Sequence, residues 1–289
     1  MKKLMCALAA VAAGVAMADV SSANIVGYNT INTGANKRYA TLTPCFLPVS
    51  GATTYKMKDL TASGFAFNGG NPDTLQALDS ASTSTKAEYL YCDKAMADAL
   101  CEEYKMPAGS FDAYIGWWDQ KKGGLGVAAA DEDAIANGTG FLGDIRSGSD
   151  VAVQSSGEAP TKSTSYTTDG KRYPLFGCYI PKALKLKQLT ASGFDYNGGN
   201  PDTLQVLDPV TTSTKAEYLY CDKVMADALC EEYKMPAGSF DAYIGWWDQK
   251  KGGLGVAPAD EDDVVIGETF LGDIRSLSEV TVNFPSSLD

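Results

Sequence analysis

Two pairs of adjacent tryptophans are the residues of this sequence best suited to binding chemistry. Trp117 and Trp118 follow Tyr114 in the segment Ala113–Asp119, and the same seven residues return at Ala242–Asp248. Strand alternation places Trp117 on one face and Tyr114 with Trp118 on the other. One tryptophan of each pair is therefore expected in the core. The other is either covered by an opposing layer or forms an aromatic platform for a sugar ring or a protein partner.

The candidate binding residues are thus Tyr114 and Trp118 in the first copy, and Tyr243 and Trp247 in the second. Catalysis has less support. The sequence has no histidine, which excludes Ser-His-Asp and Cys-His mechanisms and histidine-ligated metals. Nothing in the sequence identifies two carboxylates as the catalytic pair of a glycosidase. We expect no enzyme, no catalytic residue and no cofactor, and a secreted hydrolase is the least favoured interpretation.

Two acidic clusters carry the oxygen ligands that calcium prefers. They are Asp131-Glu132-Asp133 and Asp260-Glu261-Asp262-Asp263. Neither has the ligand spacing of an EF-hand loop. A solvated loop is the favoured interpretation of each cluster, so the sequence predicts no metal site.

The cysteines indicate disulfides. Once the leader described below removes Cys6, six cysteines remain, and an even number in an exported protein favours disulfide pairing. Zinc is disfavoured because closely spaced cysteine pairs are absent. The best local pairs are Cys92 with Cys101, which flank or lie on a short predicted helix, and their repeats Cys221 with Cys230. Cys45 and Cys178 are left either to join the two halves or to remain buried thiols.

The N-terminus has the parts of a secretory signal peptide, namely Lys2-Lys3, an apolar run from Leu4 to Met17, and small residues before Asp19. The apolar run is shorter than the roughly 20 residues that span a bilayer. We expect cleavage after Ala18 and no membrane insertion, which predicts a secreted, periplasmic or cell-surface protein. The formal net charge of −12 opposes binding to nucleic acid or anionic lipid.

Most of the chain is a tandem duplication. Lys58–Val151 aligns without a gap with Lys187–Val280 at an offset of 129, and 17 of the 94 aligned positions differ. Identity that extends over surface positions indicates recent copying and cannot by itself mark a site. Each unit has the size of an independent domain. The predicted divisions are a signal peptide at 1–18, a domain at 19–153, a Ser/Thr/Gly/Pro-rich linker at 154–168 and a domain at 169–289.

Short apolar or alternating segments, separated by Gly, Pro, Asn and Asp, favour β-structure. In Asp93–Tyr104, by contrast, Asp93 is placed to cap a helix, and Met96, Leu100 and Tyr104 share one helical face. The predicted fold is mainly β, with two tandem sandwich-like or barrel-like domains and one short helix in each. Strands of the first unit are expected at Ile25–Ile31, Thr41–Leu47, Thr74–Leu78, Lys86–Cys92, Ala113–Asp119, Gly140–Ile145 and Val151–Val153.

Several short motifs together form a recognisable pattern. They are Ala23-Asn24-Ile25-Val26-Gly27-Tyr28, Leu78-Asp79, the Tyr89–Tyr91 strand, Gly116-Trp117 and Gly138-Thr139-Gly140-Phe141-Leu142. The chain resembles a set of uncharacterised exported bacterial β-repeat proteins that begin with an Asn-x-Val-Gly-Tyr-like sequence and carry Gly-Trp and Gly-x-Gly-Phe-Leu motifs. The second unit departs from the pattern, because it lacks the opening motif and has Gly267-Glu268-Thr269-Phe270-Leu271. The resemblance implies no activity.

Export, duplication and the missing histidine together predict a non-enzymatic protein with a structural or cell-surface interaction role. Its expected partners are further copies of itself or components of the cell envelope. The alternative is bivalent carbohydrate binding by exposed tyrosine and tryptophan platforms, in which the partner is a polysaccharide and duplication adds avidity.

Overall fold

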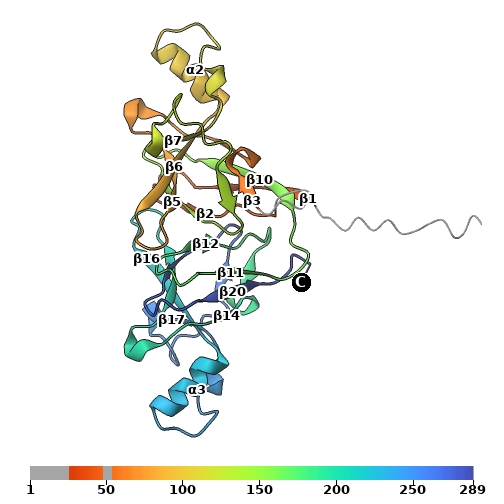
Figure 1. Cartoon of the computed structure of the whole chain (residues 1–289), viewed down its shortest axis with the longest axis vertical. Helices are drawn as coiled ribbons and strands as arrows, with labels where there is room; N and C mark the ends of the chain where they lie inside the picture. The colour runs from red at the N-terminus through yellow and green to blue at the C-terminus, as the bar shows by residue number, and fades with distance from the viewer. Residues whose placement is uncertain (1–25, 48–53, 289) are drawn as a thin grey trace, which may run out of the picture.

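The structure is a computed structural model that describes residues 26–47 and 54–288, so the predicted signal peptide lies outside the described residues. Within them the chain forms two similar β-domains with one short α-helix each, which confirms the predicted fold class. Figure 1 shows the domains following one another along the long axis. Helices α2 (Lys94–Glu103) and α3 (Lys223–Glu232) lie at opposite ends of the molecule.

Three antiparallel sheets build the first domain. The largest has the order β2-β9-β5-β6-β7, with bounds Thr41–Leu42, Phe141–Asp144, Thr74–Leu78, Thr85–Cys92 and Gly116–Asp119. The second has the order β1 (Val26–Asn32), β10 (Ala152–Glu158), β4 (Leu60–Ser63), and the third pairs β3 (Thr54–Lys56) with β8 (Ala134–Ala136). Because β1 and β10 pair along their full lengths, the two ends of the unit close the domain.

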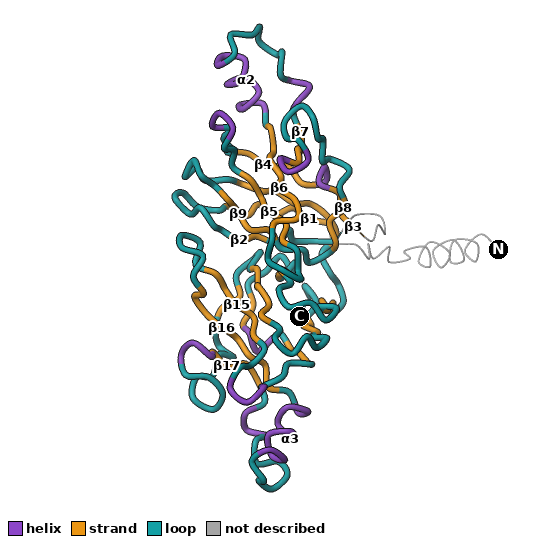
Figure 2. The backbone as a smooth tube through the Cα atoms, turned by 60° about the vertical axis from the view of Figure 1, so that its left-hand side comes forward, coloured by secondary structure: helices purple, strands orange, loops and turns teal. Residues whose placement is uncertain are grey.

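The second domain repeats this arrangement, as the strands in Figure 2 show. Its large sheet has the order β12-β19-β15-β16-β17, with bounds Leu175–Gly177, Thr269–Asp273, Thr203–Leu207, Thr214–Cys221 and Gly245–Asp248. The smaller sheets are β11 (Thr164–Thr167), β20 (Thr281–Phe284), β14 (Thr190–Ser192) in that order, and the pair β13 (Leu184–Lys185) with β18 (Asp263–Val264).

Short 3₁₀ turns join the strands at matching places in both domains. In the first domain they are η2 (Met57–Asp59), η3 (Asn68–Gly70), η4 (Asp112–Tyr114) and η5 (Gln120–Lys122). In the second they are η6 (Leu186–Gln188), η7 (Asn197–Gly199), η8 (Asp241–Tyr243) and η9 (Gln249–Lys251).

One tryptophan of each adjacent pair lies at the centre of its domain. Trp117 is 1% exposed, and its indole Nε1 donates to the main-chain oxygen of Leu60 at 2.8 Å. This bond connects the large sheet to the end of β4 in the smaller one. Trp246 makes the same bond to Leu189. A buried indole satisfies its only donor in this way and contributes a large apolar surface to the core.

The predicted strand Ala113–Asp119 is only half strand. Asp112–Tyr114 forms η4, and β7 begins at Gly116. Gly116 has φ of +140°, a conformation that a residue with a side chain rarely adopts. A Cβ there would lie 2.9 Å from a carboxylate oxygen of Asp131. Gly116 therefore ends the alternation that was expected to run from Ala113.

The predicted linker at 154–168 is mostly strand. It contains the greater part of β10 and all of β11, which pair with β1 and β20 respectively. Ser and Thr are common there, yet side chains alternate between buried and exposed along β10, as in a strand with one covered face. The connection between the domains is consequently confined to residues 159–163.

The predicted disulfides are not formed, because all six cysteines of the described residues are free and buried. Cys92 ends β6 and lies opposite Gly116 in the sheet, whereas Cys101 lies near the end of α2. At 1.5 Å per residue that end is roughly 10 Å along the helix axis from its start, and a disulfide needs Cα atoms within about 7 Å. The predicted bonds Cys92 to Cys101 and Cys221 to Cys230 are therefore wrong.

Cys45 and Cys178 remain as buried thiols at the boundary between the domains. Their neighbours are joined directly, since the amide of Phe46 donates to the oxygen of Tyr179 at 2.9 Å. Burial raises the pKa of the Cys45 thiol to about 11 and that of the Cys178 thiol to about 12. Such thiols hold their protons at neutral pH and are poor nucleophiles.

The domains meet through a pseudo-two-fold set of main-chain hydrogen bonds. Two of these bonds each have a counterpart made by the matching residues of the other domain, as in an isologous dimer. The amides of Tyr39 and Tyr173 donate to the oxygens of Pro209 and Ser80, both at 2.7 Å, and those of Thr43 and Gly177 donate to Gly267 and Gly138 at 3.1 and 3.0 Å. Near the axis, the buried hydroxyls of Thr43 and Thr269 lie 3.0 Å apart.

Candidate functional site

The four aromatic residues predicted from sequence are brought together as two pairs. Tyr114 and Trp118 lie edge to face with ring centroids 5.7 Å apart, and Tyr243 and Trp247 repeat this geometry at the same distance. Each indole donates to the main-chain oxygen of its tyrosine, at 2.7 Å in the first pair and 2.6 Å in the second. The tryptophans thus hold the turn that carries each tyrosine.

Trp118 and Trp247 do not form open platforms. Trp247 is only 9% exposed, and Trp118 is partly buried. A sugar ring needs an open aromatic face for stacking, and the indole N–H groups already have partners. Of the two alternatives left open by the sequence, burial of Trp247 favours packing over an exposed platform for that residue.

Each pair is the inner end of a row of four aromatic rings that reaches the surface. In the first domain the centroid distances are 5.9 Å from Tyr104 to Phe111 and 5.3 Å from Phe111 to Tyr114. The second domain repeats the row as Tyr233, Phe240, Tyr243 and Trp247. The outer tyrosines are more than half exposed. The accessible aromatic surface therefore belongs to Tyr104 and Tyr233, not to the tryptophans.

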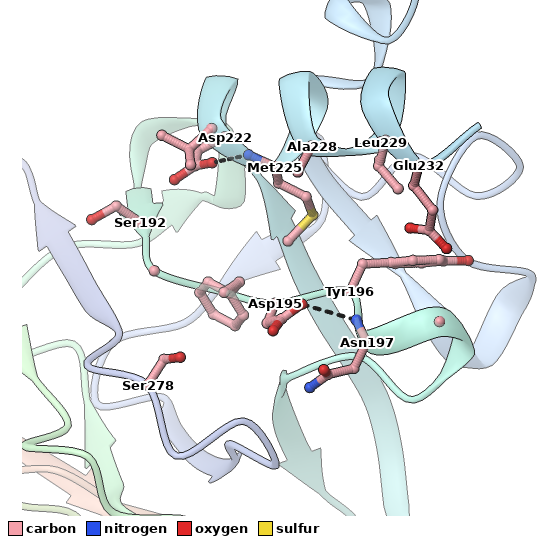
Figure 3. A pocket seen from close by; sticks show the side chains of 14 residues that line it. Ser192, Asp195, Tyr196, Asn197, Asp222, Met225, Ala228, Leu229, Glu232 and Ser278 are labelled. Carbon is pink, nitrogen blue, oxygen red and sulfur yellow. Dashed lines mark hydrogen bonds between the residues drawn. The ribbon is translucent and has the colours of Figure 1, made fainter. Parts of the chain in front are cut away.

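A groove lies beside this row in each domain. Its two walls are the α-helix and the loop that follows β4 in the first domain or β14 in the second. The first groove, of about 560 Å³, lies between Gly64–Gly69 and α2. The second groove, of about 570 Å³, lies between Ser192–Gly198 and α3 and is shown in Figure 3. These are volumes that accommodate a small ligand or one or two sugar rings. Since the helices lie at opposite ends of the molecule, so do the grooves.

Local sequence chemistry fixes the helix wall of the second groove. The carboxylate of Asp222 accepts a hydrogen bond from the amide of Met225 at 2.8 Å and so caps α3. Met225 and Leu229 are four residues apart, which places both buried side chains on the face toward the groove. Asp93, Met96 and Leu100 take these places in the first domain.

The loop wall depends on one glycine that lets the chain approach a neighbouring segment and on a second that permits a tight turn. Gly193 has φ of +85°, and a Cβ there would lie 2.2 Å from the main-chain oxygen of Glu279. Gly198 has φ of +55° within the tight turn of η7. Between these glycines the loop presents Phe194, which is buried, and Tyr196, which is partly buried.

A smaller aromatic pocket of about 240 Å³ adjoins the second groove. It shares Tyr196 and Leu229 with the groove, and its other walls are Tyr233, Phe240, Tyr243 and Leu254. The predicted binding residue Tyr243 therefore does line a cavity, although the cavity is formed with residues that the sequence did not single out.

The polar groups of the second groove are carboxylates, the amide of Asn197 and the hydroxyls of Ser192, Tyr196 and Ser278. Figure 3 shows the carboxylate of Glu232 reaching from α3 toward the ring of Tyr196, and Asn197 at the loop end. Asp195 accepts a hydrogen bond from the amide of Asn197 at 3.0 Å. No lysine or arginine lines either groove among the described residues. This combination suits ligands that stack on aromatic rings, make apolar contacts and form hydrogen bonds, and it disfavours anions.

The acidic clusters have protein partners. Asp131 accepts a hydrogen bond from the amide of Trp117 at 2.9 Å, and Asp133 accepts one from the hydroxyl of Tyr89 at 3.3 Å. Hydrogen bonds from Lys56 and Lys58 lower the pKa of Glu132 to about 2. In the part of the chain that the structure describes, no group of three or more Cys, Asp or Glu residues is arranged to hold a metal ion.

Sequence reasoning missed the groove because its two walls are distant in sequence and neither is distinctive alone. The amphipathic helix was predicted, whereas the loop that ends in the glycine turn after Phe67 was not singled out. The two segments come together because β4, which precedes the loop, packs against β6, which leads into α2. The signal that was available was Phe65-x-Phe67 directly before Asn68-Gly69-Gly70, which places aromatic side chains next to a turn.

Among the described residues, no helix has the length and apolar character to cross a membrane. Comparison with known proteins adds no functional assignment: no family model, no curated protein and no solved structure matches the chain. The resemblance to exported β-repeat proteins accordingly stays a prediction, and function has to be argued from the two grooves.

Proposed function

We propose that the protein is a non-enzymatic bivalent binding protein with a structural or cell-surface interaction role. The observation that carries the proposal is the repetition of one groove, with its row of aromatic rings, at both ends of a single elongated body. Hydrogen bonds between the main chains of the two domains hold the grooves at a fixed spacing. One molecule can then connect two ligands, or two sites on one long ligand.

Polysaccharide is the ligand class that the lining favours. Tyr196 and Tyr233 offer partly or largely accessible rings for the apolar faces of sugars, and Asn197 and Glu232 can bond to sugar hydroxyls. The absence of basic side chains from both linings disfavours sulfated or phosphorylated polymers. Neutral or amine-bearing glycans fit this chemistry.

A blocking experiment tests the site. Ala99 in α2 and Ala228 in α3 line the two grooves with small, exposed side chains. We expect Ala99→Trp to fill the first groove and Ala228→Trp to fill the second, and the double variant to lose retention on insoluble chitin and cellulose. Glu102→Trp and Glu231→Trp are matched controls, because these exposed helix positions lie outside the linings. Unchanged retention of the folded double variant would contradict the proposal.

A capture experiment tests bivalency. Protein adsorbed on insoluble chitin through one groove should bind a labelled soluble N-acetylglucosamine hexamer through the other groove. Either single blocking variant should still adsorb but should no longer capture the labelled hexamer. Capture that survives either block would show that the two grooves are not the two binding sites. Release of soluble sugar from the polymer during the assay would contradict the non-enzymatic part of the proposal.

A further inference from the structure

The two grooves are matched copies that differ in few lining positions. Asp222, Met225, Leu229 and Glu232 of the second groove have identical counterparts in the first. The lining changes only where Ala66, Phe67 and Ala95 are replaced by Asp195, Tyr196 and Val224. These substitutions lie outside the buried core, since Ala66, Ala95 and their counterparts are exposed or partly buried. They therefore change what the groove offers to a ligand.

The first of these changes adds a carboxylate. Asp195 is exposed in the loop wall, whereas Ala66 takes its place in the first groove. The second groove thus has Asp195, Asp222 and Glu232 in its lining, with no basic side chain, against Asp93 and Glu103 in the first. An additional carboxylate in a partly enclosed lining favours a cation and disfavours an anion.

The second change adds a hydroxyl where the groove meets the aromatic pocket. Tyr196 keeps the ring of Phe67 and adds a phenolic oxygen that can donate or accept a hydrogen bond. Figure 3 shows this ring lying beneath the carboxylate of Glu232, with Asp195 next to it in the loop. A positively charged group placed over the ring would meet the aromatic face and nearby carboxylates together.

We propose that the second groove selects sugars that carry a protonated primary amine, such as glucosamine units, over their N-acetylated forms, and that the first groove does not make this distinction to the same degree. The inference rests on the proposed carbohydrate function. N-acetylation removes the charge and leaves the sugar ring unchanged, so the comparison isolates the contribution of the amine.

The test measures binding of a glucosamine hexamer and an N-acetylglucosamine hexamer by calorimetry, at low salt and mildly acidic pH, where the amine is charged and ordinary carboxylates are ionised. Ala99→Trp fills the first groove, so this variant measures binding to the second groove alone. Ala228→Trp fills the second groove and measures binding to the first. We expect the ratio of affinities to favour the amine about two- to fivefold more in the second groove, the range expected for one exposed ion pair. Added salt should reduce this difference.

Reciprocal exchanges locate the cause. Asp195→Ala with Tyr196→Phe should remove the preference from the second groove, and Ala66→Asp with Phe67→Tyr should create it in the first. Thermal unfolding of every variant confirms that it is folded. Equal preferences in the two grooves, with exchanges that have no effect, would overturn the inference and leave carbohydrate binding intact.

Two other outcomes are distinguishable. Failure of both hexamers to bind either groove would overturn the carbohydrate function together with this inference. Binding of a trilysine peptide as tight as that of the glucosamine hexamer would show that the second groove recognises ammonium groups on peptides, and would overturn selection for an amino sugar.

Discussion

The grooves and the interface between the domains differ in how far the two copies have diverged. The grooves keep their helix wall almost unchanged, with Ala95 and Val224 the one difference there. At the interface Gly140 corresponds to Thr269, and Thr43 lies where the second domain has Gly177. A Cβ on Gly140 would lie 2.4 Å from Thr269, and one on Gly177 would lie 2.3 Å from Thr43. The contacting surfaces at the interface are complementary, whereas the helix walls of the two grooves stay alike.

The largest expected effect tests whether the two cores are equivalent. Trp117→Ala and Trp246→Ala each remove a fully buried ring and orphan a main-chain oxygen. We expect each to lower the free energy of unfolding of its own domain by about 3–5 kcal/mol, measured by urea denaturation. Losses that differ by more than about 1 kcal/mol would show that the cores are not energetically equivalent.

The next effect concerns complementarity at the interface. Gly140→Ala should cost about 1–3 kcal/mol because its Cβ would overlap the side chain of Thr269. Thr269→Gly in the same chain should recover part of that loss, so a double-mutant cycle in thermal or urea unfolding should give a favourable coupling. Strict additivity of the two substitutions would mean that the strain at Gly140 arises elsewhere, for example at Leu175.

A smaller effect compares the two helix caps. Asp93→Ala and Asp222→Ala each remove a side-chain acceptor for a helix amide, and we expect about 1 kcal/mol of local destabilisation. Hydrogen exchange of the first-turn amides in α2 and α3 should increase to the same extent in the two variants. Asp93→Asn and Asp222→Asn, which keep a capping oxygen, are the matched controls and should retain most of the protection.

The smallest effect lies in the exposed acidic clusters, where the copies differ. Lys56 and Lys58 both contact the carboxylate of Glu132 and lower its pKa to about 2, whereas the carboxylate of Glu261 forms an ion pair with Lys187. A depressed folded pKa stabilises the fold above the unfolded value of about 4.5, and the stabilisation is lost as pH falls through about 2. NMR titration should place the midpoint of Glu132 below that of Glu261. Lys58→Met should raise the titration midpoint of Glu132. An unchanged midpoint would show that the contact with Lys58 does not lower the pKa of Glu132.

The sequence predicted those elements whose pattern is local. β5 was predicted with its exact bounds at Thr74–Leu78, and α2 was predicted because a capping residue precedes an amphipathic run. The sequence did not predict where β7 begins, since Gly116 adopts a positive φ and lies beside the carboxylate of Asp131, a contact between segments that a local pattern does not show. β10 was taken partly for a linker because its serines are polar, although β1 and β4 on either side make it a central strand.

The candidate site was predicted only where its residues form a local pattern. Tyr114 and Tyr243 were singled out because they lie near repeated tryptophans, and the structure places Tyr243 in a cavity wall. The sequence left the exposure of Trp247 open because alternation in a single strand does not show which face another layer covers. The groove itself depends on a loop and a helix that pack together only in the folded domain.

The reciprocal hydrogen bonds between Tyr39 and Pro209, and between Tyr173 and Ser80, have a consequence for how the molecule assembles. Two separate subunits with this interface would associate only above a threshold concentration. In this chain residues 159–163 join the two domains, so their association is intramolecular and does not depend on protein concentration. The paired architecture can therefore persist at concentrations at which an untethered dimer with the same interface would dissociate.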